Sequence, residues 1–155
     1  MSFQISGLDP APFRHLYGLS DDALAREGAR RMIVDSAPGF PDRIELRDLA
    51  VGERVILLNY THQPADTPFR SAHAIFVREG AETAHVAIDE IPDVLRRRTI
   101  SLRAFDAAGE MIDAALCEGQ ALAPAILRML ADPWADYLHA HYATRGCYAA
   151  LIERA

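Results

Sequence analysis

The alternation of apolar and polar residues predicts several strands in the first two thirds of this chain. Residues 55–60 begin with Val-Ile-Leu-Leu, which is apolar on both faces of a strand and therefore indicates the buried centre of a sheet. Residues 31–34, 72–78 and 82–88 carry shorter strand patterns. Residues 4–8 predict an edge strand, because two prolines that follow it cannot donate ladder hydrogen bonds.

The clearest hairpin joins residues 99–106 to residues 110–118 through the turn Ala107-Ala108-Gly109. Apolar residues at alternate positions predict one half-buried face on each strand, made of Ile100, Leu102 and Ala104 on the first and Ile112, Ala114 and Leu116 on the second. A last strand pair is predicted at residues 137–142 and from Gly146 onward.

Three helices are expected between these strands. Ser20 is a typical N-cap, followed by two aspartates that suit the positive end of the helix dipole, and Gly28 ends that helix. A short helix has Pro92 in its first turn, and residues 121–130 follow helical spacing. The pattern predicts a single α+β domain over residues 1–155, with a mostly antiparallel sheet of about six to eight strands and two or three helices on one side.

The composition excludes several classes of function. The chain of 155 residues carries a net charge of −6, which disfavours binding to nucleic acid. It contains no lysine, so Schiff-base chemistry and a phosphate-binding P-loop are excluded. With only two cysteines and no apolar run of membrane-spanning length, we expect a cytoplasmic protein with reduced thiols and no membrane partner.

The last strand pair carries the highest density of reactive side chains. Tyr137, His139 and His141 alternate along a strand and therefore share one face. Two imidazoles on one strand can bind a metal, but a catalytic zinc needs a third ligand, for which His62, His73, Cys147 or a carboxylate are the candidates. None has a diagnostic spacing, so we expect no metal and keep a metal on His139 and His141 as the alternative.

The role of Cys147 depends on the register of this strand pair. If residues 143–146 form a four-residue loop, His141 lies opposite Tyr148, and Cys147 falls on the core side with Tyr142 and Leu151. A shift of one residue would place Cys147 opposite His141 and create a Cys/His nucleophile pair. His139, His141 and Cys147 are accordingly the candidate catalytic residues.

A second group of candidates lies where the strand at 55–60 runs into a loop. Tyr60 and His62 share a face there, beside Asn59, the only asparagine in the chain. Arginine recognises carboxylate or phosphate through two parallel hydrogen bonds, so an arginine near His62 would indicate an anionic ligand. The candidates are Arg70, Arg78 and Arg145, and we choose Arg70 with Tyr60 and His62 as ligand-binding residues.

Several segments together resemble a bacterial family of small single-domain proteins catalogued only as a domain of unknown function. They are Pro38-Gly39-Phe40-Pro41-Asp42-Arg43, Leu57 to Pro64, Pro68-Phe69-Arg70-Ser71, Ile75 to Arg78, Leu102 to Asp106, and His139-Ala140-His141 with Gly146-Cys147-Tyr148. The resemblance implies no reaction, substrate or cofactor. The family pattern has cysteine where this chain has Asp42, so a joint role of that cysteine with Cys147 is not implied here.

Three functional hypotheses follow. The first is a site for a small, anionic ligand in which Tyr60, His62 and Arg70 face the strand of His139 and His141. The second is an enzyme that uses a metal on His139 and His141 or the Cys/His pair. The third is a structural or interaction protein that forms a homodimer through exposed sheet edges.

Overall fold

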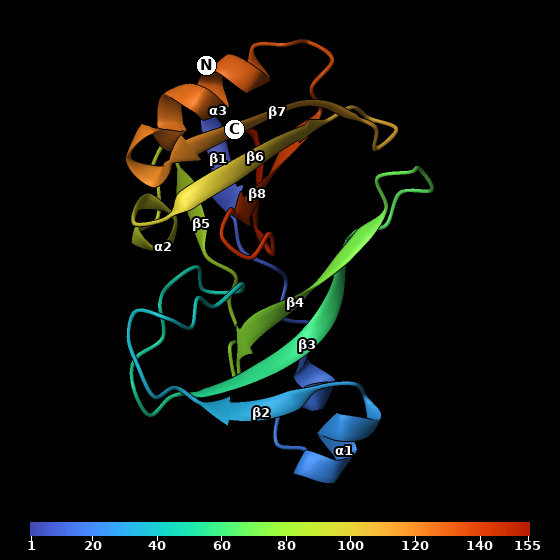
Figure 1. Ribbon diagram of the computed structural model, residues 1–155, viewed down its shortest axis with the longest axis vertical. Coiled ribbons are helices and arrows are strands. Elements are labelled where there is room, and N and C mark those ends of the chain that lie inside the picture. The colour runs from blue at the N-terminus through green and yellow to red at the C-terminus, as the bar shows by residue number, and fades with distance from the viewer.

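The computed structural model describes all residues, 1–155, and contains two antiparallel sheets (Figure 1). The predicted α+β class is confirmed. The nine strands are β1 Phe3–Ser6, β2 Arg30–Ile33, β3 Arg54–Gln63, β4 Ser71–Arg78, β5 Val86–Ile88, β6 Thr99–Phe105, β7 Met111–Glu118, β8 Tyr137–Tyr142 and β9 Tyr148–Arg154. The helices are α1 Asp21–Arg26, α2 Asp93–Arg96 and α3 Leu122–Leu130, with short 3-10 turns at Arg14–Leu16 and Gly119–Ala121.

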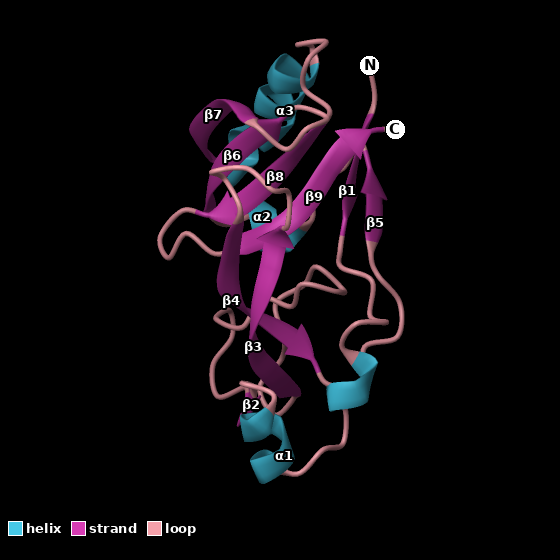
Figure 2. Ribbon diagram, turned by 90° about the vertical axis from the view of Figure 1, so that its right-hand side faces the viewer, coloured by secondary structure: helices cyan, strands magenta, loops and turns pink.

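Sheet A has six strands in the order β5-β1-β9-β8-β6-β7. Alternate residues of its central strands, such as Leu102, Leu138 and Ile152, are fully buried on the face that α3 covers. Helix α3 contributes Leu122 and Ile126 to this core, and Figure 2 shows α3 along the upper part of the sheet. The other face of sheet A is therefore free to carry polar residues.

Sheet B has three strands in the order β2-β3-β4, with β3 at its centre. Ile56 and Ile75 bury one of its faces against Leu24 of α1, and Ser20 caps α1 as predicted by accepting a hydrogen bond from the Ala23 amide. Sheet B lies below sheet A in Figure 1, and the end of β3 and the start of β4 extend upward beside it. The end of sheet B where β3 meets β4 therefore lies next to sheet A.

The segment between β2 and β3 joins the two sheets through a buried arginine. Arg43 is only 2 % exposed. Its guanidinium donates hydrogen bonds to the carbonyl oxygens of Tyr148 (2.8 Å) and Pro41 (2.6 Å) and to the sulfur of Cys147 (3.1 Å), and lies over the ring of Tyr142. The loop is thus fixed to the start of β9.

The structure corrects several predicted elements. Strand β1 lies between β5 and β9 and is not an edge strand, and the predicted strand at 82–88 is confined to β5. On β7 the residues Ile112 and Leu116 are exposed, because the register with β6 turns Ala115 and Cys117 toward the helical face instead. The longest helix, α3, has nine residues, so none of the helices could span a lipid bilayer.

Candidate functional site

Strands β3 and β4 bring two histidines together at their junction. Tyr60 pairs with His73 across the sheet, and a bulge between Thr61 and Gln63 inserts His62 as an extra residue. The ring nitrogens His62 Nε2 and His73 Nδ1 lie 2.7 Å apart, with the two ring planes at 7°. The two rings are thus nearly parallel, and the short distance between the nitrogens is a hydrogen bond from one imidazole to the other.

Strand β8 adds two more histidines from the other sheet. His139 and His141 lie on the face of sheet A that points away from α3, as their alternation predicts. The ring centre of His62 lies 5.8 Å from that of His139 and 4.9 Å from that of His141, both edge to face. Tyr148, opposite His141 on β9, lies parallel to His62 at 5.3 Å.

Three ring nitrogens in this cluster have no hydrogen-bond partner although they are buried. The Nδ1 atom of His141 donates to the carbonyl oxygen of Gly146 at 2.9 Å, because a carbonyl can only accept. The Nε2 atom of the neutral His141 ring therefore carries a lone pair, and no hydrogen-bond donor reaches it. The Nδ1 atoms of His62 and His139 also have no partner. Buried polar atoms without partners are uncommon and call for an explanation.

Burial keeps these histidines neutral. It lowers the pKa of His62 to about 4, with the neighbouring His73 and Arg103 adding to the effect. It lowers the pKa of His139 and of His141 to about 3, and lowers that of His73 as well. A neutral imidazole offers a lone pair to a metal or to a hydrogen-bond donor.

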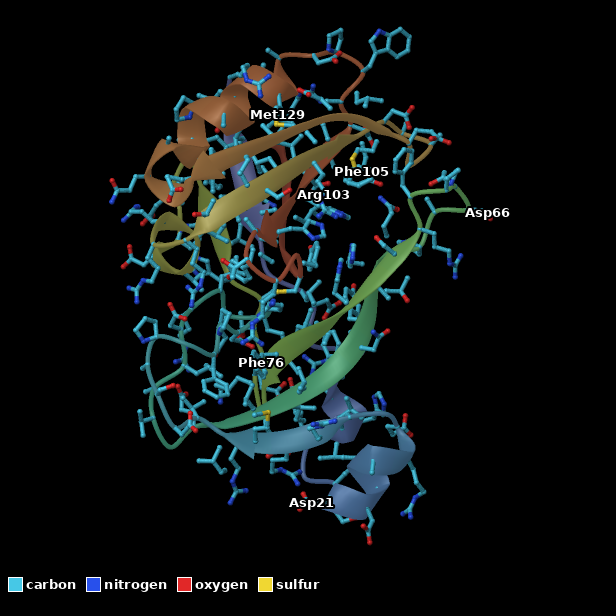
Figure 3. All side chains as sticks on the ribbon, viewed as in Figure 1. Asp21, Asp66, Phe76, Arg103, Phe105 and Met129 are labelled. Carbon is cyan, nitrogen blue, oxygen red and sulfur yellow. The ribbon has the colours of Figure 1, made fainter.

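Arg103 is the cation of the site. It lies on β6 and pairs with His139 of the neighbouring strand β8 (Figure 3). Its charge adds to the lowering of the pKa of all four histidines. The side chain is partly buried and forms no ion pair, and its one hydrogen bond is a long contact of 3.5 Å to Ser101. Burial without a carboxylate lowers its pKa. An unpaired arginine facing buried polar groups is suited to an anion.

A hollow of about 410 Å³ adjoins the cluster at His62 and His139. Its other walls are Gln63, Pro64, Ala65, Ala107, Ala108, Gly109, Tyr137, Leu151 and Glu153. Two contacts connect the sheets here: Gln63 Nε2 donates to the Tyr137 hydroxyl at 2.8 Å, and the Thr67 hydroxyl donates to the Gly109 carbonyl oxygen at 3.2 Å. The volume is within the range of small-molecule sites.

The structure brings some of the predicted residues together and separates others. His62, His139 and His141 lie in one cluster, and Tyr60 borders it, 6.3 Å from Tyr148 between ring centres. Arg70 is exposed, and its guanidinium donates to the carbonyl oxygen of Pro64 instead of facing the histidines. Of the other arginine candidates, Arg78 is paired with Glu45 and Arg145 is exposed.

Cys147 lies on the core side, as the four-residue loop predicts. His141 is opposite Tyr148, and the Cys147 thiol packs against the core of sheet A. The prediction that Leu151 shares the core side with Cys147 is wrong. A bulge opposite the step from Ala140 to His141 inserts an extra residue in β9, which turns Leu151 toward the hollow with His139. The register leaves Cys147 apart from His141.

Sequence reasoning did not select Arg103 or Tyr148. Arg103 alternates with Leu102 and Ala104, whose burial was predicted, so the strand pattern already directed it to the opposite face. The pattern does not specify that β6 pairs with β8, and it is this pairing that places Arg103 beside His139. Pairing between distant strands is not encoded in the alternation of either strand.

The fold and the site together define an α+β protein with two antiparallel sheets and a histidine cluster between them. A family profile described as Protein of unknown function (DUF1203) matches residues 39–154, and the chain belongs to this family. The predicted resemblance is thereby confirmed. No match was found among curated proteins or among solved structures.

The residue that departs from the expected family pattern has a structural role. Asp42 is completely buried, and its carboxylate accepts hydrogen bonds from the backbone amides of Glu45 and Arg78. Burial raises its pKa, while these hydrogen bonds act in the opposite direction. The side chain thus fixes the loop that carries Arg43 against β4.

Proposed function

We propose that this protein binds a small molecule with an anionic group at the histidine cluster, with Arg103 as the residue that recognises the charge. The observation that supports the proposal is the environment of Arg103. A partly buried guanidinium without a carboxylate partner costs free energy, and a bound anion would offset that cost through charge-assisted hydrogen bonds.

The neutral groups around Arg103 suit the rest of such a ligand. His139 lies beside Arg103 and lines the hollow, and Tyr148 and the hydroxyl of Ser101 border the same group of rings. Neutral imidazoles and hydroxyls can both donate and accept hydrogen bonds, so they can orient polar groups of a ligand. Glu153, an exposed carboxylate on the hollow, disfavours a second negative charge at that end.

The alternative function is catalysis, but the geometry of the cluster supports ligand binding better. The Cys147 thiol accepts a hydrogen bond from Arg43 and lies on the other side of the strand pair from His141, so no nucleophile is aligned with a histidine. His139 or His141 could act as a general base toward a bound ligand, since burial keeps both neutral.

The test is a thermal-unfolding screen of metal-free protein against small carboxylates, phosphate and phosphate esters at constant ionic strength. A ligand at about a hundred times its Kd should stabilise the fold by about 2.7 kcal/mol, a rise of roughly 5–10 °C in Tm. Arg103→Gln should weaken binding at least about tenfold, because a hydrogen bond to a charged group contributes about 1.5–3 kcal/mol.

Arg26→Gln is the matched control. Arg26 is exposed on α1 and does not line the hollow, so this variant should bind as the unmodified protein does. The proposal fails if no anion raises Tm beyond the salt control, or if Arg103→Gln retains full affinity.

A further inference from the structure

We propose that His62, His73 and His141 form a binding site for a divalent transition metal of the zinc type, with one coordination position left open. One ring nitrogen from each of the three residues lies within 4.8 Å of the others. The inference concerns the same cluster as the proposed anion site, but it does not require that proposal to be correct.

Coordination would require side-chain movements at all three histidines. Two nitrogens bound to one zinc ion at about 2.0–2.1 Å lie roughly 3.3 Å apart. The hydrogen bond between His62 and His73, now 2.7 Å long, would therefore break, and the ring that donates it would take its proton on its other nitrogen instead. Both rings would turn until their lone pairs point at the ion, and His141 would move toward them.

His141 has the arrangement that metal-binding histidines typically show. Its Nδ1–H donates to the backbone carbonyl of Gly146, which fixes the ring and leaves the lone pair of Nε2 directed away from that bond. His141 is fully buried, and Nε2 has no partner among the protein atoms. A metal ion would supply the partner that this atom lacks.

The ligand type and number indicate which metals fit. Imidazole nitrogens suit Zn²⁺, Co²⁺, Ni²⁺, Cu²⁺ and Fe²⁺ better than Mg²⁺ or Ca²⁺, which prefer oxygen ligands. Three histidines with one open position are typical of a catalytic zinc site. His139 is the fourth histidine of the cluster and lies further from His62 than His141 does.

Arg103 is the main opposing charge. Its guanidinium disfavours a dication nearby, because like charges in a partly buried site repel. An anion in the open position would compensate both the metal and Arg103. Metal binding should therefore be tighter in the presence of the anions that the protein itself binds, and the two effects must be reciprocal.

The experiment uses tag-free protein that has been dialysed against a chelator and titrated with Co²⁺ or Zn²⁺. We expect one equivalent to bind, with the visible absorption bands of tetrahedral Co²⁺ and a rise in Tm that Mg²⁺ does not reproduce. His73→Gln, the variant at the least buried ligand, and His141→Gln should both lose stoichiometric binding.

The exposed His15→Gln and His85→Gln are the controls, and both should retain one equivalent. The proposal is overturned if the unmodified protein binds no equivalent, if His73→Gln and His141→Gln still bind, or if either control loses binding. Circular dichroism of each metal-free variant shows whether it is folded. If a variant is not folded, the proposal is judged on whether the unmodified protein binds one equivalent of metal. Anion binding by metal-free protein, measured separately, tests the proposed function independently.

Discussion

At the scale of single residues, two arginines without a carboxylate partner differ in how many hydrogen bonds their guanidinium groups form. Arg43 is fully buried and Arg103 is partly buried, and neither forms an ion pair. Arg43 satisfies its guanidinium with two carbonyl oxygens, a sulfur atom and an aromatic ring. Arg103 has a single long contact. We infer that Arg43 stabilises the fold, whereas Arg103 costs stability and is available for a ligand.

Arg43→Lys should lower the free energy of unfolding by about 2–4 kcal/mol. A lysine cannot reproduce the planar fork, so buried carbonyl oxygens would lose their donors. Urea unfolding of Arg43→Lys is compared with that of Arg26→Lys, a control at an exposed arginine whose side chain forms no hydrogen bond or ion pair. Equal stability of the two variants would show that the Arg43 hydrogen bonds are not needed.

Arg103→Met should have the opposite effect in ligand-free protein. Removing an unpaired, partly buried charge should raise the free energy of unfolding by about 0.5–2 kcal/mol, the range of single stabilising substitutions in general. Urea unfolding without added anion or metal measures this difference. A loss of stability similar to that of Arg43→Lys would assign Arg103 a structural role instead.

At the scale of elements, the sequence predicted where strands and helices lie better than how they pair. Helix α3 and strands β3, β4, β6 and β7 lie close to their predicted ranges, because hydrophobic periodicity and turn residues act locally. The division into two sheets was not predictable, since a local pattern does not specify a distant partner. The bulges at His62 and after Ala140 depend on that pairing and were therefore also missed.

The contact between the β6–β7 turn and the loop after β3 provides a test at this scale. Gly109 has a φ of 83°, and a Cβ atom there would overlap the Cβ of Ala65. Gly109→Ala should therefore lower the free energy of unfolding by at least about 1–3 kcal/mol, from backbone strain and from the displaced loop. Thermal or urea unfolding measures the loss.

The double variant Gly109→Ala/Ala65→Gly separates the two causes. It removes the close approach to Ala65 but keeps the positive φ, so it should recover part of the lost stability. An absence of any recovery would mean that the two loops do not meet as described.

At the scale of the whole molecule, the site exists because sheet B meets the open face of sheet A. The histidines of β3 and β4 are about seventy positions away from those of β8. No local pattern specifies this convergence, because it depends on how the two sheets pack. The sequence therefore provided no reason to consider Arg103, which lies beside His139 only through the pairing of β6 with β8, whereas Arg70 donates to the Pro64 carbonyl. Connections such as Gln63 to Tyr137 maintain the approach of the sheets.

The buried histidines should make the metal-free fold sensitive to acid. Burial lowers the pKa of His62 to about 4 and of His139 and His141 to about 3, against 6.5 when unfolded. Below pH 6.5 the unfolded chain therefore binds more protons than the fold does, so stability is retained above pH 6.5 and lost as the pH falls. The loss between pH 6.5 and 5 should be on the order of 4 kcal/mol.

Urea unfolding at several pH values in the presence of a chelator measures this slope. Each histidine contributes about 1 kcal/mol per pH unit, so His139→Gln should reduce the slope by roughly a third. A fold that is equally stable at pH 7 and pH 5 would show that the imidazoles are not buried in the neutral form.

The most direct test of the account is a crystal structure of zinc-treated, tag-free protein, with anomalous scattering measured on both sides of the zinc absorption edge. The account predicts one peak per chain, about 2.0–2.1 Å from a ring nitrogen of each of His62, His73 and His141, with His141 Nδ1 still bonded to Gly146. It is contradicted if zinc binds only at the exposed His15 or His85, or if the histidines of β3, β4 and β8 point away from one another.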